Sequence, residues 1–380
     1  MKREDFGKRA LLVHKKLRGK ITITPKASVK NKGDLSVYYT PGVGAVSSYL
    51  ATHKEKMAEY TMKGNTVAVI SDGSAVLGLG NIGPEGALPV MEGKAMLFKA
   101  LSGIDAFPIV LATQDTEAII ATVKNIAPVF GGINLEDIAA PRCFEIERRL
   151  QEELSIPVLH DDQHGTALVV LSGLINALKV AKKNPKQVRL VIAGVGAAGT
   201  AIAELLMLYG VGDIVMIDSR GTLHKKRSDL EAQKRVLVNK TNKQGIVGGL
   251  DEALAGADVF IGVSKGNTVT EKQVASMAKD AIVFALANPV PEIMPDVAKK
   301  AGALVVATGR SDFANQINNS LGFPGIFRGA LDHKVRKITD KMLIQAAKNL
   351  AALVKNPTTD RIVPNTFDVG VVSAVARAIR

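Results

Sequence analysis

The chain has 380 residues, of which 47% are hydrophobic, and its 49 Lys and Arg against 36 Asp and Glu give a formal net charge of +13. This length predicts two domains, and the apolar content is enough for a large core. No window holds the roughly 18 apolar residues of a membrane span, and the charged start lacks the apolar run of a secretory signal, so we expect no membrane partner. A single cysteine, Cys143, excludes an internal disulfide framework and favours a cytoplasmic location.

The positive charge fits two kinds of partner, nucleic acid or small polyanions such as dinucleotides and dicarboxylates. Aromatic residues make up only 4% of the chain and Trp is absent, so platforms for base stacking are scarce. We therefore expect small anions and no nucleic acid.

The predicted elements alternate between strands and helices along the chain. In the first half we expect a strand at 66–70, a helix from 91, a strand at 105–112, helices at 116–130 and 143–154, a strand at 156–160 and a long apolar helix at 165–183. From residue 187 a strand, a Gly-rich turn, a helix and a strand follow, with later strands at 258–263, 281–287 and 303–308. This alternation predicts an α/β fold with parallel sheets. We place an N-terminal α/β domain at 1–158 and a C-terminal, Rossmann-like doubly wound domain at 159–380.

The stretch "LVIAGVGAAG" carries Gly194, Gly196 and Gly199 in the G-x-G-x-x-G pattern, after a strand and at the start of a helix. These glycines allow a tight turn and close approach of a pyrophosphate to the helix N-terminus. Asp218 ends the next strand, 19 residues beyond Gly199, where an acidic side chain binds the ribose hydroxyls. A carboxylate there favours NAD over NADP. The basic residues that follow could reverse that preference, or could simply be a solvated loop, and they are Arg220, Lys225 and Lys226.

Two segments carry adjacent acids after apolar runs: Glu136 and Asp137 in "GGINLEDI", and Asp161 and Asp162 in "HDDQH". Carboxylates of this kind bind hard divalent cations, so we predict Mg²⁺ or Mn²⁺ opposite Asp162.

Two alternatives remain for the second acidic segment. Either aspartate could cap the helix predicted from residue 165. His160 and His164 have the i, i+4 spacing of a zinc site, but His160 ends a strand, so the two rings should diverge.

Several stretches together resemble the malic enzymes in their small bacterial form, from about residue 35 to residue 331. They are "YYTPGVG", "SDGSAVLGLGNIGPEGALPVMEGKAML", "FGGINLEDI", "HDDQHGTA", "GVGAAG", "FALANPVPEI" and "ATGRSDFANQINNSLGFPGIFRGAL". The resemblance implies oxidative decarboxylation of L-malate to pyruvate and CO₂, with NAD(P)⁺ and Mn²⁺ or Mg²⁺. It also implies an N-terminal domain joined to a Rossmann-like domain, and a homodimer.

Carried over by motif, the resemblance assigns roles to particular residues. The catalytic residues are Tyr39 as acid, Lys94 as base and Asp161 in support of Lys94. The metal ligands are Glu136, Asp137 and Asp162. The substrate asparagines are Asn288, Asn318 and Asn319. The cofactor contacts are Asn288, Asp218 and the turn formed by Gly194, Gly196, Ala197, Ala198 and Gly199.

The chain departs from the family pattern at Ala75, where larger members carry an arginine that grips a malate carboxylate. Arg310, backbone amides at 78–80 and the asparagines are the candidates to replace it. His164 receives no role from the sequence.

The expected chemistry needs a base at the malate hydroxyl and an acid at C3. Lys94 requires a lowered pKa for the first step, and burial and a cation both act in that direction. Tyr39 protonates C3 after CO₂ leaves, either in its own subunit or in a neighbour's. Two other functions stay in competition: an oxaloacetate decarboxylase of the same fold with little redox activity, and a nucleotide-sensing or nucleic-acid-binding protein with a relic dinucleotide fold.

Overall fold

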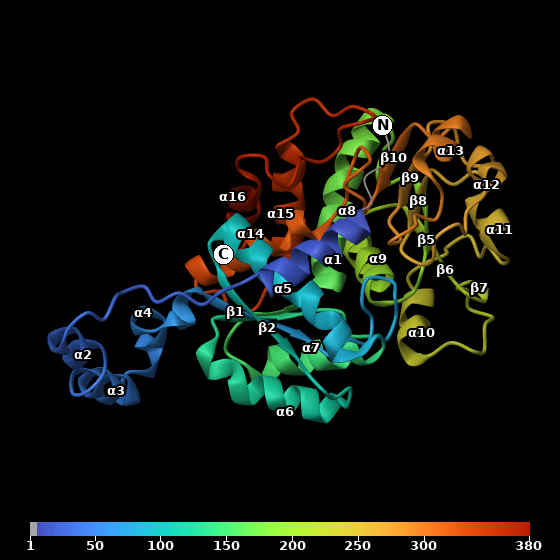
Figure 1. Cartoon of the computed structure of the whole chain (residues 1–380). Helices are drawn as coiled ribbons and strands as arrows, with labels where there is room; N and C mark the ends of the chain where they lie inside the picture. Colours follow the sequence, from blue (N-terminus) through green and yellow to red (C-terminus); the bar gives the residue numbers. More distant parts are fainter. Residues whose placement is uncertain (1–5) are drawn as a thin grey trace.

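The computed structural model describes residues 6–380, and its body consists of two parallel sheets with helices packed on them (Figure 1). Residues 1–5, part of the charged start, lie outside the described residues. The predicted α/β class, with a Rossmann-like second sheet, is confirmed.

The first sheet has the strand order β2-β1-β3-β4 and is parallel throughout. Its strands are β1 (Thr66–Ser71), β2 (Asp105–Val110), β3 (Gly132–Leu135) and β4 (Val158–His160). All six residues of β1 are buried, as expected for a central strand covered on both faces. The connecting helices are α5 (Gly83–Ser102), α6 (Thr116–Ile126) with the short η3 (Ala127–Val129), and α7 (Arg142–Glu153), which buries Cys143.

Two helices begin earlier than the sequence predicted. Helix α5 starts at Gly83 and not at residue 91, because Pro84 occupies its first turn, where proline favours initiation. Helix α8 (Asp161–Val180) starts four residues before 165, with His160 at the N-cap position. The alternative that Asp161 or Asp162 caps this helix is therefore wrong. Both acids lie in its first turn, where negative charge complements the helix dipole.

The second sheet has the strand order β10-β9-β8-β5-β6-β7, in which only the pairing of β6 with β7 is antiparallel. Its strands are β5 (Arg189–Ala193), β6 (Asp213–Asp218), β7 (Gly221–Thr222), β8 (Val259–Gly262), β9 (Ile282–Ala285) and β10 (Val305–Thr308). Its helices are α9 (Ala197–Tyr209), α10 (Ala232–Val238), α11 (Leu250–Leu254), α12 (Glu271–Ala275) and α13 (Pro295–Lys300). From β5 the chain first adds β6 on one side and later adds β8 on the other side. The crevice between β5 and β8 is therefore the switch point at which such sheets bind ligands.

Helix α8 joins the two sheets without a linker, because it follows β4 directly and is buried for most of its length. One apolar core includes Val67 of β1, Leu168 of α8 and Ile192 of β5. The last helices complete this core, and they are η4 (Asn319–Leu321), α14 (Phe323–Asp332), α15 (Asp340–Ala352) and α16 (Val371–Ala376). The division at 158/159 stays a prediction, and it falls inside this continuous strand–helix segment.

The N-terminal elements pack differently, since none of the described residues 6–65 is buried. They are α1 (Phe6–Leu17), α2 (Lys32–Tyr38), α3 (Gly42–Thr52), η1 (Lys54–Lys56), α4 (Met57–Tyr60) and η2 (Met62–Asn65). Figure 1 shows α2 and α3 at the far left, away from both sheets. We call residues 32–60 the arm. Within residues 6–380, no helix has both the length and the apolar character needed to cross a membrane.

Candidate active site

Four carboxylates gather where β3 and β4 end. Glu136 and Asp137 follow β3, Asp161 and Asp162 follow β4, and these strands are parallel neighbours, so their carboxyl ends share one edge of the sheet. The turn at Asp137 is left-handed, with φ of 53°, which is uncommon outside glycine. The backbone N–H of Asp137 donates a hydrogen bond to Asp162 Oδ2 at 2.8 Å, which fixes one segment against the other.

Lys94 of α5 reaches into this acidic edge. Its Nζ donates to Glu136 Oε1 at 2.6 Å and also to Asp161, and it lies 4.3 Å from the centre of the Phe323 ring. The side chain is only 6% exposed. Burial acts to lower the pKa of Lys94, but the charges of Asp161 and Glu136 outweigh it and raise the pKa above its usual range. The lowered pKa expected from the sequence is therefore not found, and Lys94 is an ammonium in this arrangement.

The acids carry more negative charge than Lys94 can balance. Burial, with Asp162 as the next contribution, raises the pKa of the Asp137 carboxyl to about 9. Burial also raises the pKa of Asp161 to about 6, although Lys94 acts in the opposite direction. The pKa values of Glu136 and Asp162 are likewise raised, first by burial. Such a set of acids calls for further positive charge.

The donor types and one oxygen fit a hard divalent cation. Asp137 Oδ2 is buried without a hydrogen-bond partner, so it has lone pairs to offer. Glu136 is already engaged, by Lys94 and by Asn134 Nδ2 at 2.9 Å. Across the described residues 6–380, no group of three or more His, Cys, Asp or Glu side chains is arranged as a preformed metal centre. Each Glu136 oxygen accepts one hydrogen bond, so each keeps a lone pair with which Glu136 can join Asp137 and Asp162 as a ligand.

The two histidines of the acidic segment have separate surroundings. His160 is fully buried with both ring nitrogens unpartnered, and burial lowers its pKa. His164 Nε2 lies 3.1 Å from Glu147 Oε2 of α7. Glu147 also accepts from the His160 backbone N–H at 2.8 Å and from Gln163 Nε2 at 3.0 Å. His164 thus helps to anchor the start of α8.

Glu147 was not predicted from the sequence, although a signal existed. Cys143, Ile146 and Leu150 form the buried face of α7, and Glu147 lies on that same face. A lone carboxylate within an apolar helical stripe indicates a buried polar anchor.

The Gly-rich turn has the geometry of a pyrophosphate site. Gly194 has φ of 114°, and a Cβ on it would lie 2.6 Å from the carbonyl oxygen of Val263. A Cβ on Gly199 would lie 1.9 Å from the carbonyl oxygen of Gly194, whereas a Cβ on Gly196 would meet nothing within 4 Å. The predicted contacts Ala197 and Ala198 are the first residues of α9, so its N-terminus faces this open space.

Asp218 ends β6 as predicted, but its carboxylate is fully engaged. Oδ1 accepts from Arg227 Nη1 at 2.7 Å and from the Arg220 backbone N–H at 3.0 Å. Oδ2 accepts from Arg227 Nη2 at 3.1 Å and from Lys234 Nζ at 3.0 Å. Burial acts to raise the pKa of Asp218, but these donors outweigh it and lower the pKa. Arg227 and Lys234 were not predicted from the sequence as partners of Asp218.

The loop after β1 meets the loop after β9, so the two sheets approach each other at these strand ends. A Cβ on Gly78 would lie 2.3 Å from the backbone oxygen of Asn288, and φ of Gly78 is 73°. Asn288 is exposed there. Arg310 donates to the Pro289 carbonyl at 3.2 Å, which places this candidate for the carboxylate contact beside Asn288.

The other predicted substrate residues differ in how free they are. The Asn318 side chain accepts from the Ser320 N–H at 2.9 Å as the cap of η4, so its oxygen is occupied. Asn319 begins η4 and is half-buried. The loop residue Ala75, in place of the family arginine, donates its N–H to the Asp137 carbonyl at 3.0 Å.

The structure does not bring Tyr39 to Lys94 within one chain. Tyr39 lies between α2 and α3 in the arm and is 67% exposed.

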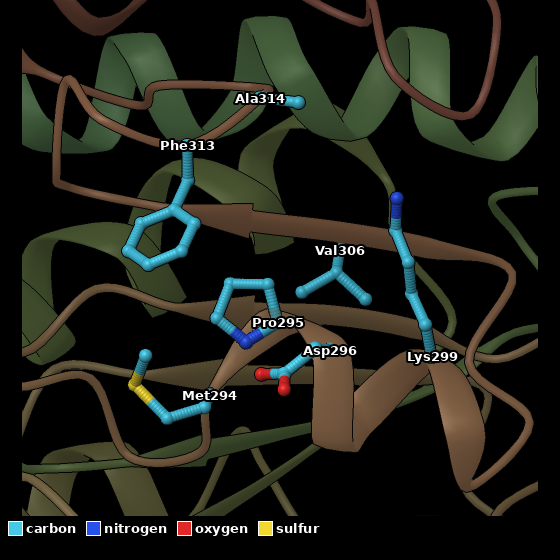
Figure 2. Close-up of a pocket in the computed structure, with 7 residues that line it drawn as sticks. All are labelled: Met294, Pro295, Asp296, Lys299, Val306, Phe313 and Ala314. Atoms are coloured by element: carbon cyan, nitrogen blue, oxygen red, sulfur yellow. The ribbon is translucent and has the colours of Figure 1, made fainter. Parts of the chain in front are cut away.

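A surface pocket of about 490 Å³ lies elsewhere, around α13 and β10. Figure 2 shows its lining, which includes Met294, Lys299 and Phe313. None of the predicted site residues lines it, so the strand ends that carry Lys94 and the four carboxylates remain the candidate active site.

Two family models match the chain: "Malic enzyme, N-terminal domain" over residues 18–151 and "Malic enzyme, NAD binding domain" over residues 163–379. The chain is 53% identical to the bifunctional malic/malolactic enzyme of Bacillus subtilis (strain 168), over 97% of this chain and 91% of that protein. It is 42% identical to an NADP-dependent malic enzyme of Halomonas elongata, over 96% and 90% of the two chains. The solved NAD-dependent malic enzyme of Thermotoga maritima superposes with a TM-score of 0.95 and 49% identity, over 97% of this chain and 98% of that one.

Proposed function

The chain belongs to the malic enzyme family, and on that premise we propose that it converts L-malate and NAD(P)⁺ to pyruvate, CO₂ and NAD(P)H with a divalent cation. The observation that carries this proposal is the buried Lys94, held between Glu136 and Asp161 at the carboxyl edge of the first sheet. A lysine confined among acids, in a chain that also carries a dinucleotide turn, suits removal of a proton from a hydroxyl group during oxidation.

Asp137, Asp162 and Glu136 would hold Mg²⁺ or Mn²⁺. Such a cation, when bound, makes a substrate hydroxyl more acidic and polarises a neighbouring keto group. The unpartnered Asp137 Oδ2 supports this assignment, as do the raised pKa values of the three acids, which mark carboxylates short of positive charge.

Lys94 takes the proton from the C2 hydroxyl of malate, for which it must first be neutral. Three carboxylates raise its pKa, those of Asp161, Glu136 and Asp162, and a cation held by Glu136 and Asp162 would offset their charge, so that burial would act in the lowering direction. Asp161 stays hydrogen-bonded to the Lys94 amine, orients it, and can accept its proton. A positioned base of this kind contributes roughly 10²–10⁴-fold to the rate.

Tyr39 delivers a proton to C3 after CO₂ has left, and we propose that it does so in the site of a second copy of the chain. The arm exposes many large apolar side chains, which mark a protein interface, among them Val37, Tyr38, Tyr39, Val43, Val46, Tyr49 and Tyr60. In a symmetric homodimer two such arms would each reach across to the partner's Lys94.

Mixing two inactive variants tests this arrangement. Lys94→Ala and Tyr39→Phe proteins are unfolded together, refolded and assayed. If Tyr39 acts across subunits, each mixed dimer has one intact site, and about a quarter of the wild-type activity returns for random pairing. If Tyr39 acts in its own subunit, every site keeps one defect, and the mixture stays as inactive as its parents.

Steady-state kinetics test the overall reaction. Purified protein with malate and Mn²⁺ should reduce NAD⁺ or NADP⁺ and release pyruvate, and Lys94→Ala should abolish this. Loss of oxaloacetate without nucleotide, with no oxidation of malate, would instead support the oxaloacetate decarboxylase. Lactate should be measured as well, because the Bacillus relative is named a malic/malolactic enzyme.

A further inference from the structure

Asp218, the carboxylate at the end of β6, has no free lone pair with which to accept a hydrogen bond from a ribose hydroxyl. A carboxylate has about four lone-pair sites, and Asp218 already receives four donors: two from Arg227, one from Lys234 and one from the backbone of Arg220. A ribose 2′-hydroxyl that donates to Asp218 would have to displace one of them. The acid that ordinarily selects NAD is therefore neutralised in this chain.

Arg227 is the group that neutralises it, and its own donors are also used up. Its side chain is 9% exposed and bridges Asp218 and Asp229. Nε donates to Asp229 Oδ1 at 2.9 Å, Nη1 donates to Asp218 and to the Gly221 carbonyl, and Nη2 donates to both acids. All five N–H groups are thus engaged, so Arg227 positions the cluster and has none left for a ligand.

Two neighbouring basic side chains, Arg220 and Lys234, have N–H groups left to donate to a ligand. Arg220 is 70% exposed and uses one N–H of its guanidinium on Asp229 at 2.9 Å. Lys234 is 26% exposed and uses one of its three N–H groups on Asp218. Together with Arg227, these two side chains carry three positive charges, and Asp218 and Asp229 carry two negative charges. The cluster therefore has a net charge of +1, to which the exposed Lys225 and Lys226 add.

We propose that this cluster binds the 2′-phosphate of NADP, with Arg220 and Lys234 as the donors and Arg227 as the residue that cancels the repulsion by Asp218. The chain then accepts NADP at least as well as NAD. The inference rests on the proposed function only in taking the Gly194–Gly199 turn as the dinucleotide site. It reverses the preference for NAD that the position of Asp218 suggested.

Calorimetric titration with two fragments of the cofactor separates the phosphate from the rest of the nucleotide. Adenosine 5′-diphosphate lacks the 2′-phosphate and 2′,5′-ADP carries it. We expect the wild-type chain to bind 2′,5′-ADP at least as tightly as 5′-ADP. Arg220→Ala or Lys234→Ala should shift the ratio of the two affinities by about tenfold against 2′,5′-ADP, as the loss of one charged hydrogen bond implies. Lys279→Ala, which removes an exposed charge elsewhere on the same domain, should leave that ratio unchanged.

Asp218→Asn adds an opposite test, since removing a negative charge should strengthen 2′,5′-ADP binding. The proposal is overturned if wild-type protein binds 2′,5′-ADP more than tenfold more weakly than 5′-ADP, or if Arg220→Ala and Lys234→Ala leave the ratio unchanged. If such a result is found but the protein still oxidises malate with NAD⁺, only the proposed phosphate site is refuted. Binding of neither fragment would remove the dinucleotide role of the glycine turn as well.

Discussion

Raising the pH should destabilise the folded chain when no divalent cation is present, and Asp137 supplies the reason. Burial, followed by the charge of Asp162, raises the pKa of this carboxyl from 3.8 to about 9. Between these two values the folded chain holds a proton that the unfolded chain has lost. The free energy of unfolding therefore falls by about 1 kcal/mol for each pH unit, or by roughly 2–3 kcal/mol from about pH 6 to about pH 8. Glu136 and Asp162, whose pKa values are also raised, act in the same direction.

Thermal unfolding of chelator-treated protein measures this effect. A change of 1 kcal/mol shifts the melting temperature by about 2–4 °C for chains of roughly 150–250 residues, so a fall of several degrees is expected between the two pH values. Mg²⁺ at about 100 times its dissociation constant adds about 2.7 kcal/mol and should largely restore the loss at the higher pH.

Asp137→Asn is the critical variant for this prediction, because an amide does not titrate. It should flatten the dependence on pH and weaken the response to Mg²⁺, whereas the exposed control Glu231→Gln should behave as wild type. The melting temperature could instead stay level or rise from about pH 6 to about pH 8, or stay the same when Mg²⁺ is added. Either result would show that Asp137 does not link stability to pH and to the cation in this way.

Three substitutions test the roles of other residues. Lys94→Met should lower kcat for malate by about 10²-fold or more and also lower the melting temperature, because Glu136 and Asp161 lose their buried partner; unchanged turnover would exclude Lys94 as the base. Tyr39→Phe should lower kcat by about 10²-fold while the melting temperature stays the same, since the ring is 67% exposed; a pronounced loss of stability would point to a packing role. Gly78→Ala should raise KM for malate, because φ is 73° and the new Cβ would lie 2.3 Å from the backbone oxygen of Asn288; wild-type kinetics would show that this contact does not shape the site.

Local sequence patterns were enough to predict the parts of the site that depend on strand ends. The glycine turn was predictable because its spacing follows a buried apolar strand and precedes a helix. Glu136 and Asp161 could be placed together because each follows a strand, and the parallel sheet then brings both strand ends to one edge.

Features that depend on long side chains or on distant contacts were not predictable in this way. The pKa of Lys94 depends on which oxygens its Nζ reaches, and Glu136 lies 42 residues away in sequence. Asp218 had the expected position, but its partners Arg227, in the loop after β7, and Lys234, in α10, follow no sequence pattern that links them to it. The placement of Tyr39 away from the site follows from an arm in which none of residues 32–60 is buried, which no periodicity reveals.

The shared use of one cation by both halves of the reaction is the central claim, and Asp162→Asn tests it most directly. Malate oxidation and the nucleotide-independent decarboxylation of oxaloacetate are measured side by side in this variant and in the wild type, at the same Mn²⁺ concentration. Both rates should fall by a similar factor, and both should recover partly as the Mn²⁺ concentration is raised. A variant that loses malate oxidation but decarboxylates oxaloacetate at the wild-type rate would contradict the claim.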